Sequence, residues 1–200
     1  LEPAKTLLGL NSDPATSEGA LTTFSAADLV QFVPALSDGD FGVEEWTRLE
    51  CRLNGKELPL AICDYFLGEK ERSYMSRHTL RHQDREEEQK CSGLLVATGA
   101  GSSGWYDSAC RYLHPGGDRF AKTEKNGKFL ATEPYHGKLN GSDMLEGRLE
   151  DGEVLEIISS NDACGAITVD SIESYEFSRG MKAEVKISGT PLRVIKPIEN

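Results

Sequence analysis

Apolar and polar residues alternate in short stretches along most of the chain, and Gly, Asn, Asp or Pro bound most of these stretches. Short alternating stretches of this kind predict β-strands. We expect strands at residues 45–53, 58–67, 74–81, 93–98, 154–158, 166–170, 174–178, 183–188 and 192–196. Because many short strands at close spacing are typical of sandwiches and barrels, the sequence predicts a mainly β protein, a complex β-sandwich of many short strands.

The first part of the chain follows another pattern. Residues 6–10 form a short apolar run that leads into a turn sequence, which predicts a buried strand followed by a turn. Residues 25–36 carry apolar side chains at helical spacing, and Ser25 with Asp28 three positions later indicates a capping box at the start of a helix. We expect Pro34 to end or kink this helix near its last turn.

This change of pattern predicts a domain boundary near residue 40. We expect residues 1–40 to form a short α/β segment and residues 41–200 to form an all-β domain. In the second part, only residues 102–113 show a helical pattern again.

Composition narrows the range of functions. The formal net charge is −11, which argues against binding to nucleic acid or to an anionic membrane surface, because both need a basic surface. No apolar run approaches the ~20 residues of a membrane span. The five cysteines are an odd number without a CxxC pair, which favours a reduced, cytoplasmic environment with thiols acting as small apolar residues.

The stretch from Thr98 to Gly104 is the most informative part of the sequence. An apolar strand leads into Thr-Gly-Ala-Gly-Ser-Ser-Gly, and a predicted helix follows. Three glycines allow close backbone approach, and the small hydroxyls add hydrogen-bonding groups for a phosphate or a sugar. The stretch matches neither a Walker A loop nor a Rossmann fingerprint. Composition alone equally allows a plain tight turn between a strand and a helix.

Other polar groupings allow two interpretations each. His78 and His82 have the spacing of a metal-binding pair on a helix, but the local pattern predicts a strand, on which four residues span roughly 13 Å. We therefore expect no shared metal ion there. A local basic surplus could attract phosphate groups or could balance a neighbouring acidic run, and it comprises Arg72, Arg77, Arg81 and Lys90. We interpret residues 85–88 as a solvated hairpin loop and Gly116-Gly117-Asp118 as an ordinary turn.

Several segments together resemble the NAD kinase family. Thr98 to Trp105 resembles the family's "TPTGSTAY" segment, and more closely the "TGTGSxAW" version of the mitochondrial-type branch. Further segments resemble family motifs in the same order along the chain: residues 8–20, 60–69, 73–77, Glu133-Pro134, Val169-Asp170-Ser171, Tyr175-Glu176-Phe177 and Gly180. The resemblance covers most of the chain and is patchy between residues 110 and 150.

The resemblance implies a fold and an activity. Members of this family phosphorylate the 2′-hydroxyl of the adenosine ribose of NAD, using ATP or polyphosphate and a divalent metal such as Mg²⁺. They have an N-terminal α/β domain and a C-terminal β domain, and they associate into homodimers or homotetramers. By this resemblance, residues 1–40 are the tail of the α/β domain and residues 41–200 are the NAD-binding β domain.

The resemblance also implies the site residues. Thr98, Gly101, Ser102, Ser103 and Trp105 are expected to line the dinucleotide site. Cys63 and Asp64 occupy the positions of the Asn-Glu pair that grips a ribose, and Asp170 matches an aspartate near the nicotinamide end.

The chain also departs from the family pattern. A thiol cannot replace the donor and acceptor of Asn at Cys63, and Ser171 stands where the family has Gly. The family's Gly-Gly-Asp-Gly segment, whose Asp helps to activate the attacking hydroxyl, is expected upstream of Leu1. Three alternatives therefore remain beside the kinase: a non-catalytic nucleotide-binding or regulatory β module, a related kinase that acts on a lipid or another alcohol, and a purely structural oligomerisation domain.

Overall fold

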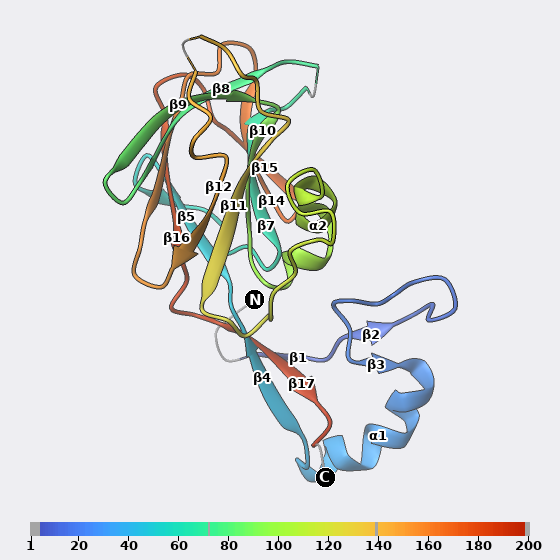
Figure 1. The fold of residues 1–200 in the computed structure, drawn as a ribbon. Coiled ribbons are helices and arrows are strands. Elements are labelled where there is room, and N and C mark those ends of the chain that lie inside the picture. Colours follow the sequence, from blue (N-terminus) through green and yellow to red (C-terminus); the bar gives the residue numbers. More distant parts are fainter. Residues whose placement is uncertain (1–4, 72, 139, 199–200) are drawn as a thin grey trace. The chain divides into compact units, whose positions relative to one another are not determined.

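The computed structural model describes residues 5–71, 73–138 and 140–198 (Figure 1). The chain forms two compact units, one from Leu1–Trp46 with Thr190–Asn200 and the other from Thr47–Gly189. Most of the expected strands and the small helical content are present, and the protein is mainly β with several sheets. The buried strand expected at residues 6–10 was wrong, because this stretch holds only β1 (Thr6–Leu7) and the start of β2 (Leu10–Asn11), and Leu7 and Leu10 are exposed. The assignment of residues 1–40 to the tail of an α/β domain stays a prediction.

The smaller unit contains two small sheets and one helix. Its three-stranded sheet has the order β1 (Thr6–Leu7), β17 (Leu192–Lys196), β4 (Gly42–Trp46), with β1 parallel and β4 antiparallel to β17. A second pair is parallel and comprises β2 (Leu10–Asn11) and β3 (Phe24–Ser25). The helix is α1 (Ala26–Asp38).

The start of α1 is as predicted, but its end is not. The Ser25 hydroxyl accepts a hydrogen bond from the Asp28 N–H, and the Asp28 carboxylate accepts one from the Ser25 N–H, which completes the capping box. The helix continues four residues beyond Pro34 and ends at Gly39, whose φ is 75°. Pro34 leaves the carbonyl of Val30 without its helical donor, and because Val30 is exposed, water can replace that donor.

The larger unit consists of two six-stranded antiparallel sheets. The first sheet has the order β12 (Glu146–Glu150), β11 (Asn126–Thr132), β10 (Gly93–Ala97), β7 (Asp64–Glu69), β14 (Gly165–Val169), β15 (Glu173–Glu176). The second sheet has the order β6 (Lys56–Glu57), β5 (Leu49–Leu53), β16 (Lys182–Ile187), β13 (Leu155–Ser159), β8 (Ser76–His82), β9 (Arg85–Cys91).

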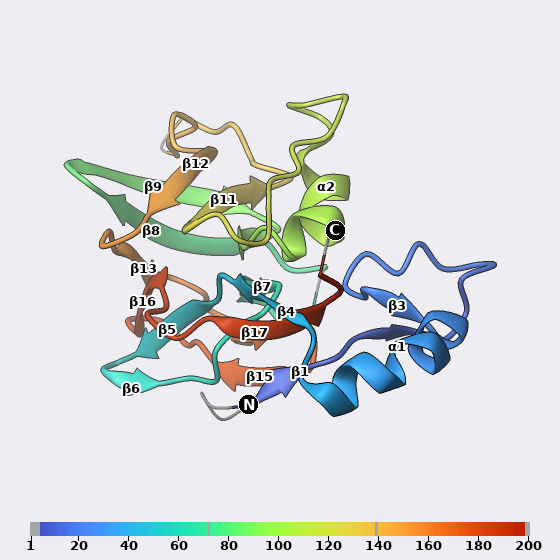
Figure 2. The same cartoon turned by 90° about the horizontal axis from the view of Figure 1, so that it is seen from below.

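Side chains from both sheets form the main core between them. Tyr65 and Leu67 of β7 meet residues such as Leu80 and Ile157 from the second sheet in this core. The alternate residues of the first sheet point to its other face, where Phe66 and its neighbours on β10 and β11 pack against α2 (Trp105–Cys110) (Figure 2). The central strands of the first sheet are therefore buried on both faces, which explains their uninterrupted apolar runs.

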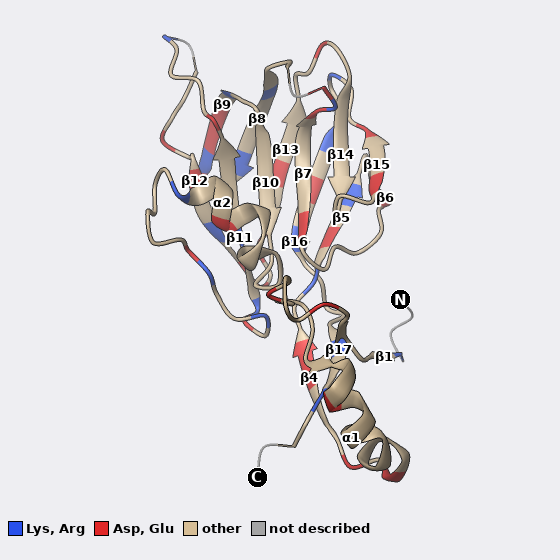
Figure 3. Ribbon diagram, turned by 90° about the vertical axis from the view of Figure 1, so that its right-hand side faces the viewer, with Lys and Arg blue, Asp and Glu red and all other residues tan. Residues whose placement is uncertain are grey.

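The acidic run at residues 85–88 lies in β9, so its interpretation as a hairpin loop was wrong. The turn lies earlier, where Gln83 has a positive φ of 55°. β9 is an edge strand, on which charged side chains are tolerated in water. Of the basic group, Arg81 of β8 pairs with Glu86 of β9 (Figure 3), whereas Arg77 pairs with Asp162 and Lys90 lies over the Tyr135 ring. Arg72 lies outside the described residues.

Three other element predictions need correction. The single strand expected at residues 45–53 is two strands, β4 and β5, and the strand expected at 58–67 begins only at Asp64. The helix expected at 102–113 is a 3₁₀ turn followed by the short α2, because the backbone of Gly104 between them is not helical. β11 and β12 were missed altogether, since glycines and charges interrupt their alternation. None of the helices within the described residues has the length and apolar character needed to cross a membrane.

Candidate functional site

The short loop that leads into β7 ends at two of the expected site residues, Cys63 and Asp64, and Asp64 is the first residue of the strand. The Asp170 carboxylate accepts hydrogen bonds from three consecutive backbone N–H groups of this loop, at 2.9 Å from Ile62, 2.8 Å from Cys63 and 3.0 Å from Asp64. The Asp170 N–H donates in return to the Asp64 carbonyl at 3.0 Å. The turn after β14 therefore holds the loop through both its backbone and its side chain.

The conformation of this turn is unusual. Asp170 and Ser171 both have a positive φ, 49° and 58°, in the tight turn between β14 and β15. Asp is found in this region several times more often than most other non-glycine residues, whereas Ser is less common there. Gly would be free of strain at position 171, which is where the resembled family has it.

Thr98 holds the same loop from the other side. Its hydroxyl donates to the Ile62 carbonyl at 2.6 Å, and its N–H donates to the Cys63 carbonyl at 2.9 Å. Asp170 thus binds the N–H groups of the loop and Thr98 binds its carbonyls. Three segments that are far apart in the sequence therefore fix one loop.

The Asp64 side chain is buried next to a second carboxylate. Burial, and then the negative charge of Asp170, raise the pKa of Asp64 to about 6. Within the described part of the chain, its carboxylate accepts no hydrogen bond, and the residue is 6% exposed. A buried acceptor in this state is ready to bind a donor from a ligand.

Cys63 has the opposite character. Burial, and then the charges of Asp170 and Asp64, raise the pKa of Cys63 to about 12, against a smaller opposing effect of Lys122. The thiol is therefore neutral at ordinary pH and is a weak hydrogen-bonding group.

The glycines of the turn after β10 serve close contacts within the chain. A Cβ atom on Gly101 would lie 2.2 Å from the Cys63 carbonyl oxygen, and one on Gly99 would lie 2.1 Å from the Ala121 carbonyl oxygen. The Ser102 hydroxyl donates to the Gly99 carbonyl at 2.8 Å and accepts from the Phe120 N–H at 3.1 Å. These contacts explain why the turn needs Gly and Ser, before any ligand is considered.

Ser103 and Trp105 lie on the less buried side of the turn. Both are half-buried, and the Ser103 hydroxyl donates to the Ala100 carbonyl at 3.2 Å. The Trp105 ring packs on Phe66 of β7, with ring centroids 4.7 Å apart. Because Asp64 and Phe66 are two residues apart on one strand, Asp64 and Trp105 belong to the same face of the first sheet.

Trp105 also lines a cavity of about 320 Å³. The other lining residues are Ser108, Ala109, Tyr112, Thr132 and Glu133. Aromatic walls with a few hydroxyl and carboxylate groups are typical of sites for small organic ligands. The sequence pointed to Trp105, but it gave no signal for Ser108 or Tyr112.

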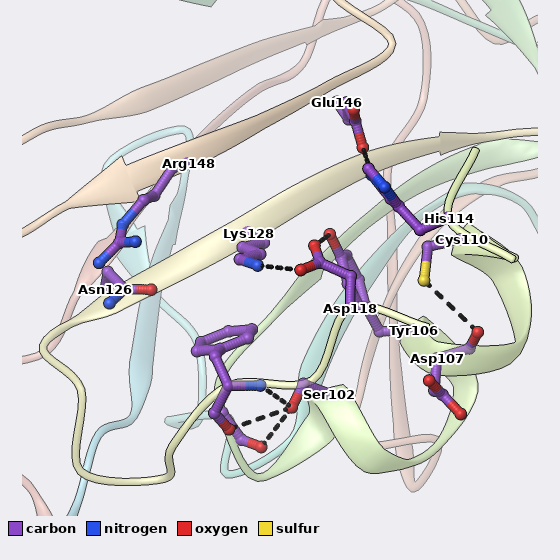
Figure 4. Close-up of polar contacts among 12 residues, drawn as sticks. Ser102, Tyr106, Asp107, Cys110, His114, Asp118, Asn126, Lys128, Glu146 and Arg148 are labelled. Carbon is purple, nitrogen blue, oxygen red and sulfur yellow. Dashed lines mark hydrogen bonds and ion pairs between the residues drawn. The ribbon is translucent and has the colours of Figure 1, made fainter. Parts of the chain in front are cut away.

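The loop after α2 is fastened by a group of ion pairs that the sequence did not indicate (Figure 4). Asp118 accepts a hydrogen bond from the Tyr106 hydroxyl at 3.2 Å and pairs with Lys128 at 2.6 Å. Arg119 pairs with Asp107 of α2 at 3.2 Å. As predicted, residues 116–118 lie in a loop, yet Asp118 also anchors that loop to α2 and β11.

The histidine pair lies on β8, as the local pattern predicted. His78 is bonded to Gln89 at 3.1 Å, and His82 is bonded to Glu153 at 3.0 Å. Each ring therefore has a different protein partner.

The comparisons with known proteins agree with the resemblance. No family model matches the chain. The chain is 27% identical, over 214 residues, to a protein from Oryza sativa subsp. japonica named probable NADH kinase, and the match covers 96% of this chain and 64% of that protein. A crystal structure of an NAD kinase from Archaeoglobus fulgidus in complex with ATP matches with a TM-score of 0.69 at 22% identity, covering 90% of this chain and 65% of that one. The structural likeness shows a shared fold, and the chain spans less than two thirds of the length of either protein.

Proposed function

Because this chain belongs to the NAD kinase family, we propose that it supplies the dinucleotide-binding part of an enzyme that makes NADP or NADPH. In this proposal, ATP donates a phosphoryl group to the 2′-hydroxyl of the adenosine ribose of NAD or NADH. One observation carries the proposal, namely the meeting of the segments around Asp64, Thr98 and Asp170 at one loop. These are the segments in which the resemblance places ribose and dinucleotide contacts.

Asp64 is the proposed ribose-binding group. An ionised carboxylate only accepts hydrogen bonds, and the hydroxyls of a ribose can donate them. Asp64 is buried, and within the described residues its carboxylate has no other donor, so a ribose hydroxyl would satisfy it.

The distance between Asp64 and the cavity at Trp105 favours a ligand with two nucleoside groups. Asp64 is the first residue of β7. Near the other end of that strand, Gly68 pairs with Gly93 of β10, and Gly93 pairs in turn with Thr132, which lines the cavity. Four residues along a strand span about 13 Å. A dinucleotide is long enough to span this length of the strand.

The proposed division of labour leaves the phosphoryl chemistry largely outside this chain. Within the described residues, no cluster of three or more His, Cys, Asp or Glu could hold a metal ion. What this chain contributes is orientation, because phosphoryl transfer depends mainly on positioning and on stabilising charge.

Calorimetric titration of the 200-residue chain with NAD, NADH and ATP tests the proposal. We expect NAD or NADH to bind, and Asp64→Asn to weaken that binding roughly tenfold or more, since hydrogen bonds to charged groups contribute about 1.5–3 kcal/mol. Asp151→Asn, an exposed carboxylate in the turn after β12, is the matched control and should bind like the wild type. Absence of any dinucleotide binding would overturn the proposal.

A second candidate function is nucleotide binding without catalysis. Cys63 favours it, because a neutral thiol replaces the amide that the resembled family uses at this position. Turnover of NAD with ATP by the protein in its natural length separates the two functions. The enzyme gives NADP, whereas a binding module binds NAD and gives none. We expect little or no turnover from the 200-residue chain, because Gly-Gly-Asp-Gly does not occur in it.

A further inference from the structure

The Asp170 carboxylate is almost fully engaged by the protein itself. Its Oδ1 atom accepts the N–H groups of Cys63 and Asp64, and its Oδ2 atom accepts that of Ile62. A carboxylate has about four acceptor positions, so three are used on backbone groups. Charge-assisted bonds of this kind are among the stronger hydrogen bonds in proteins.

The backbone at Asp170, which makes these contacts, has a conformation that is unfavourable for non-glycine residues. Two consecutive non-glycine residues, Asp170 and Ser171, have positive φ. This conformation costs free energy in a non-glycine residue, and such strain is commonly found at functional sites. The return bond from the Asp170 N–H to the Asp64 carbonyl shows which part of the site is held.

Asp64 is in the opposite state. It is buried, and its carboxylate accepts no hydrogen bond from the part of the chain that the structure describes. Of the two neighbouring carboxylates, one is occupied by backbone groups and the other remains available.

We propose that Asp170 is a positioning residue, which fixes the backbone of residues 62–64 so that the Asp64 carboxylate meets a ribose hydroxyl, and that Asp170 itself does not contact the dinucleotide. This inference rests on the proposed function and deepens it, because it assigns different roles to two acids that sequence resemblance would both place against the ligand. Asp170 acts through Asp64, so the two residues are energetically coupled.

A double-mutant cycle on NAD affinity tests this coupling. The four proteins are the wild type, Asp64→Asn, Asp170→Asn and the double variant, each titrated with NAD by calorimetry. We expect each single substitution to weaken binding roughly tenfold or more and the double variant to bind as weakly as Asp64→Asn alone, since coupled sites are not additive. If the fold-losses in NAD affinity of the two single variants multiply in the double variant, Asp170 contacts the ligand independently and the inference is overturned.

Amide hydrogen exchange gives a readout that a general loss of stability would not move. In the wild type, the amides of residues 62–64 should exchange slowly, since Asp170 accepts their protons. In Asp170→Asn, these amides should exchange faster than those of the core strand β10, while in Asp64→Asn they should stay protected. Equal protection of residues 62–64 in wild type and Asp170→Asn would contradict the positioning role.

Two further variants keep the test decisive. Ser171→Gly relieves the strain at an exposed position, leaves the carboxylate in place, and should bind NAD like the wild type. If Asp170→Asn does not fold, Asp170→Glu replaces it, because it keeps the charge but moves the oxygens one methylene away. A wild-type chain that binds neither NAD nor NADH would refute the proposed function, whereas binding with multiplied losses would refute only the role of Asp170.

Discussion

The Tyr106 hydroxyl donates a hydrogen bond to the Asp118 carboxylate at 3.2 Å and thereby joins α2 to the loop that follows it. Tyr106 is 1% exposed, and burial raises the pKa of its hydroxyl, so the group stays protonated and can act as a donor. The same carboxylate pairs with Lys128 of β11. The loop is therefore attached to both the helix and the sheet that flank the glycine-rich turn.

Removing this hydroxyl should weaken the attachment. We predict that Tyr106→Phe lowers the free energy of unfolding by about 1 kcal/mol, the usual contribution of one hydrogen bond. Urea titration followed by circular dichroism measures the change. Tyr74→Phe, at an exposed tyrosine, should leave the unfolding midpoint unchanged, and an equal loss in both variants would show that the Asp118 contact contributes nothing.

The packing of the glycine-rich turn predicts a strong effect of one added methyl group. A Cβ atom at Gly101 would lie 2.2 Å from the backbone oxygen of Cys63, which cannot move without disturbing the loop that carries Asp64. We expect Gly101→Ala to cost about 1–3 kcal/mol of stability, as overpacking usually does, and to abolish NAD binding. Gly116→Ala is the control, because nothing lies within 4 Å of a Cβ atom there. Thermal unfolding and calorimetry of both variants decide the matter, and a fully stable Gly101→Ala would mean that the turn is looser than described.

The raised pKa of Asp64 predicts a stability that depends on pH. Its pKa is 3.8 without the fold and about 6 in the fold, so the folded protein holds this proton more tightly. The proton bound to Asp64 stabilises the folded state fully below about pH 4, and this stabilisation is lost as the pH rises through about 6. We therefore expect Asp64→Asn to match the wild type near pH 4 and to be more stable by up to about 3 kcal/mol at pH 7.5.

Urea unfolding of both proteins at the two pH values gives the comparison for Asp64. A variant that is less stable than the wild type at pH 7.5 would contradict an unpaired buried carboxylate. A more stable but non-binding variant would show that this site trades stability for ligand binding.

The lowered pKa of His78 predicts a pH dependence of stability that is opposite in sign to that of Asp64. Burial lowers its pKa from 6.5 to about 4, against smaller opposing effects of Gln89 and Glu87. The neutral ring therefore stabilises the fold above pH 6.5, and this contribution is lost as pH falls through about 4. We expect the wild type to lose about 3 kcal/mol through His78 over this range, and His78→Gln to lose correspondingly less. Acid titrations of stability measure both, with His136→Gln, at an exposed histidine, as a control that should follow the wild type.

Local signals in the sequence were sufficient for elements whose stabilising contacts are local. The capping box of Ser25 and Asp28 lies within four residues, and the alternation of β16 and β8 is carried by each strand alone. The prediction for β9 was wrong because its Glu86 pairs across the hairpin with Arg81, a contact that no pattern within one strand contains. β11 was not predicted from the sequence, because the charge of its Lys128 is balanced by Asp118 of a loop, which the strand pattern does not show.

The candidate site was predictable only in part, for a related reason. Resemblance located Asp64, Thr98 and Asp170 one by one, and the structure brings all three to one loop. Their separate tasks depend on hydrogen bonds between residues that are 36 to 108 positions apart. No pattern along the chain shows that Asp170 is occupied by backbone amides while Asp64 is left without a donor.

The connection between β1 and β17 has a consequence for biosynthesis. Thr6 pairs with Arg193, so the three-stranded sheet of the smaller unit needs residues that lie almost 190 positions apart. While the ribosome is still adding residues 47–189, β1 and β4 lack the strand that lies between them. A nascent chain that stalls before residue 190 therefore displays two unpaired strand edges, which are targets for chaperones and proteases.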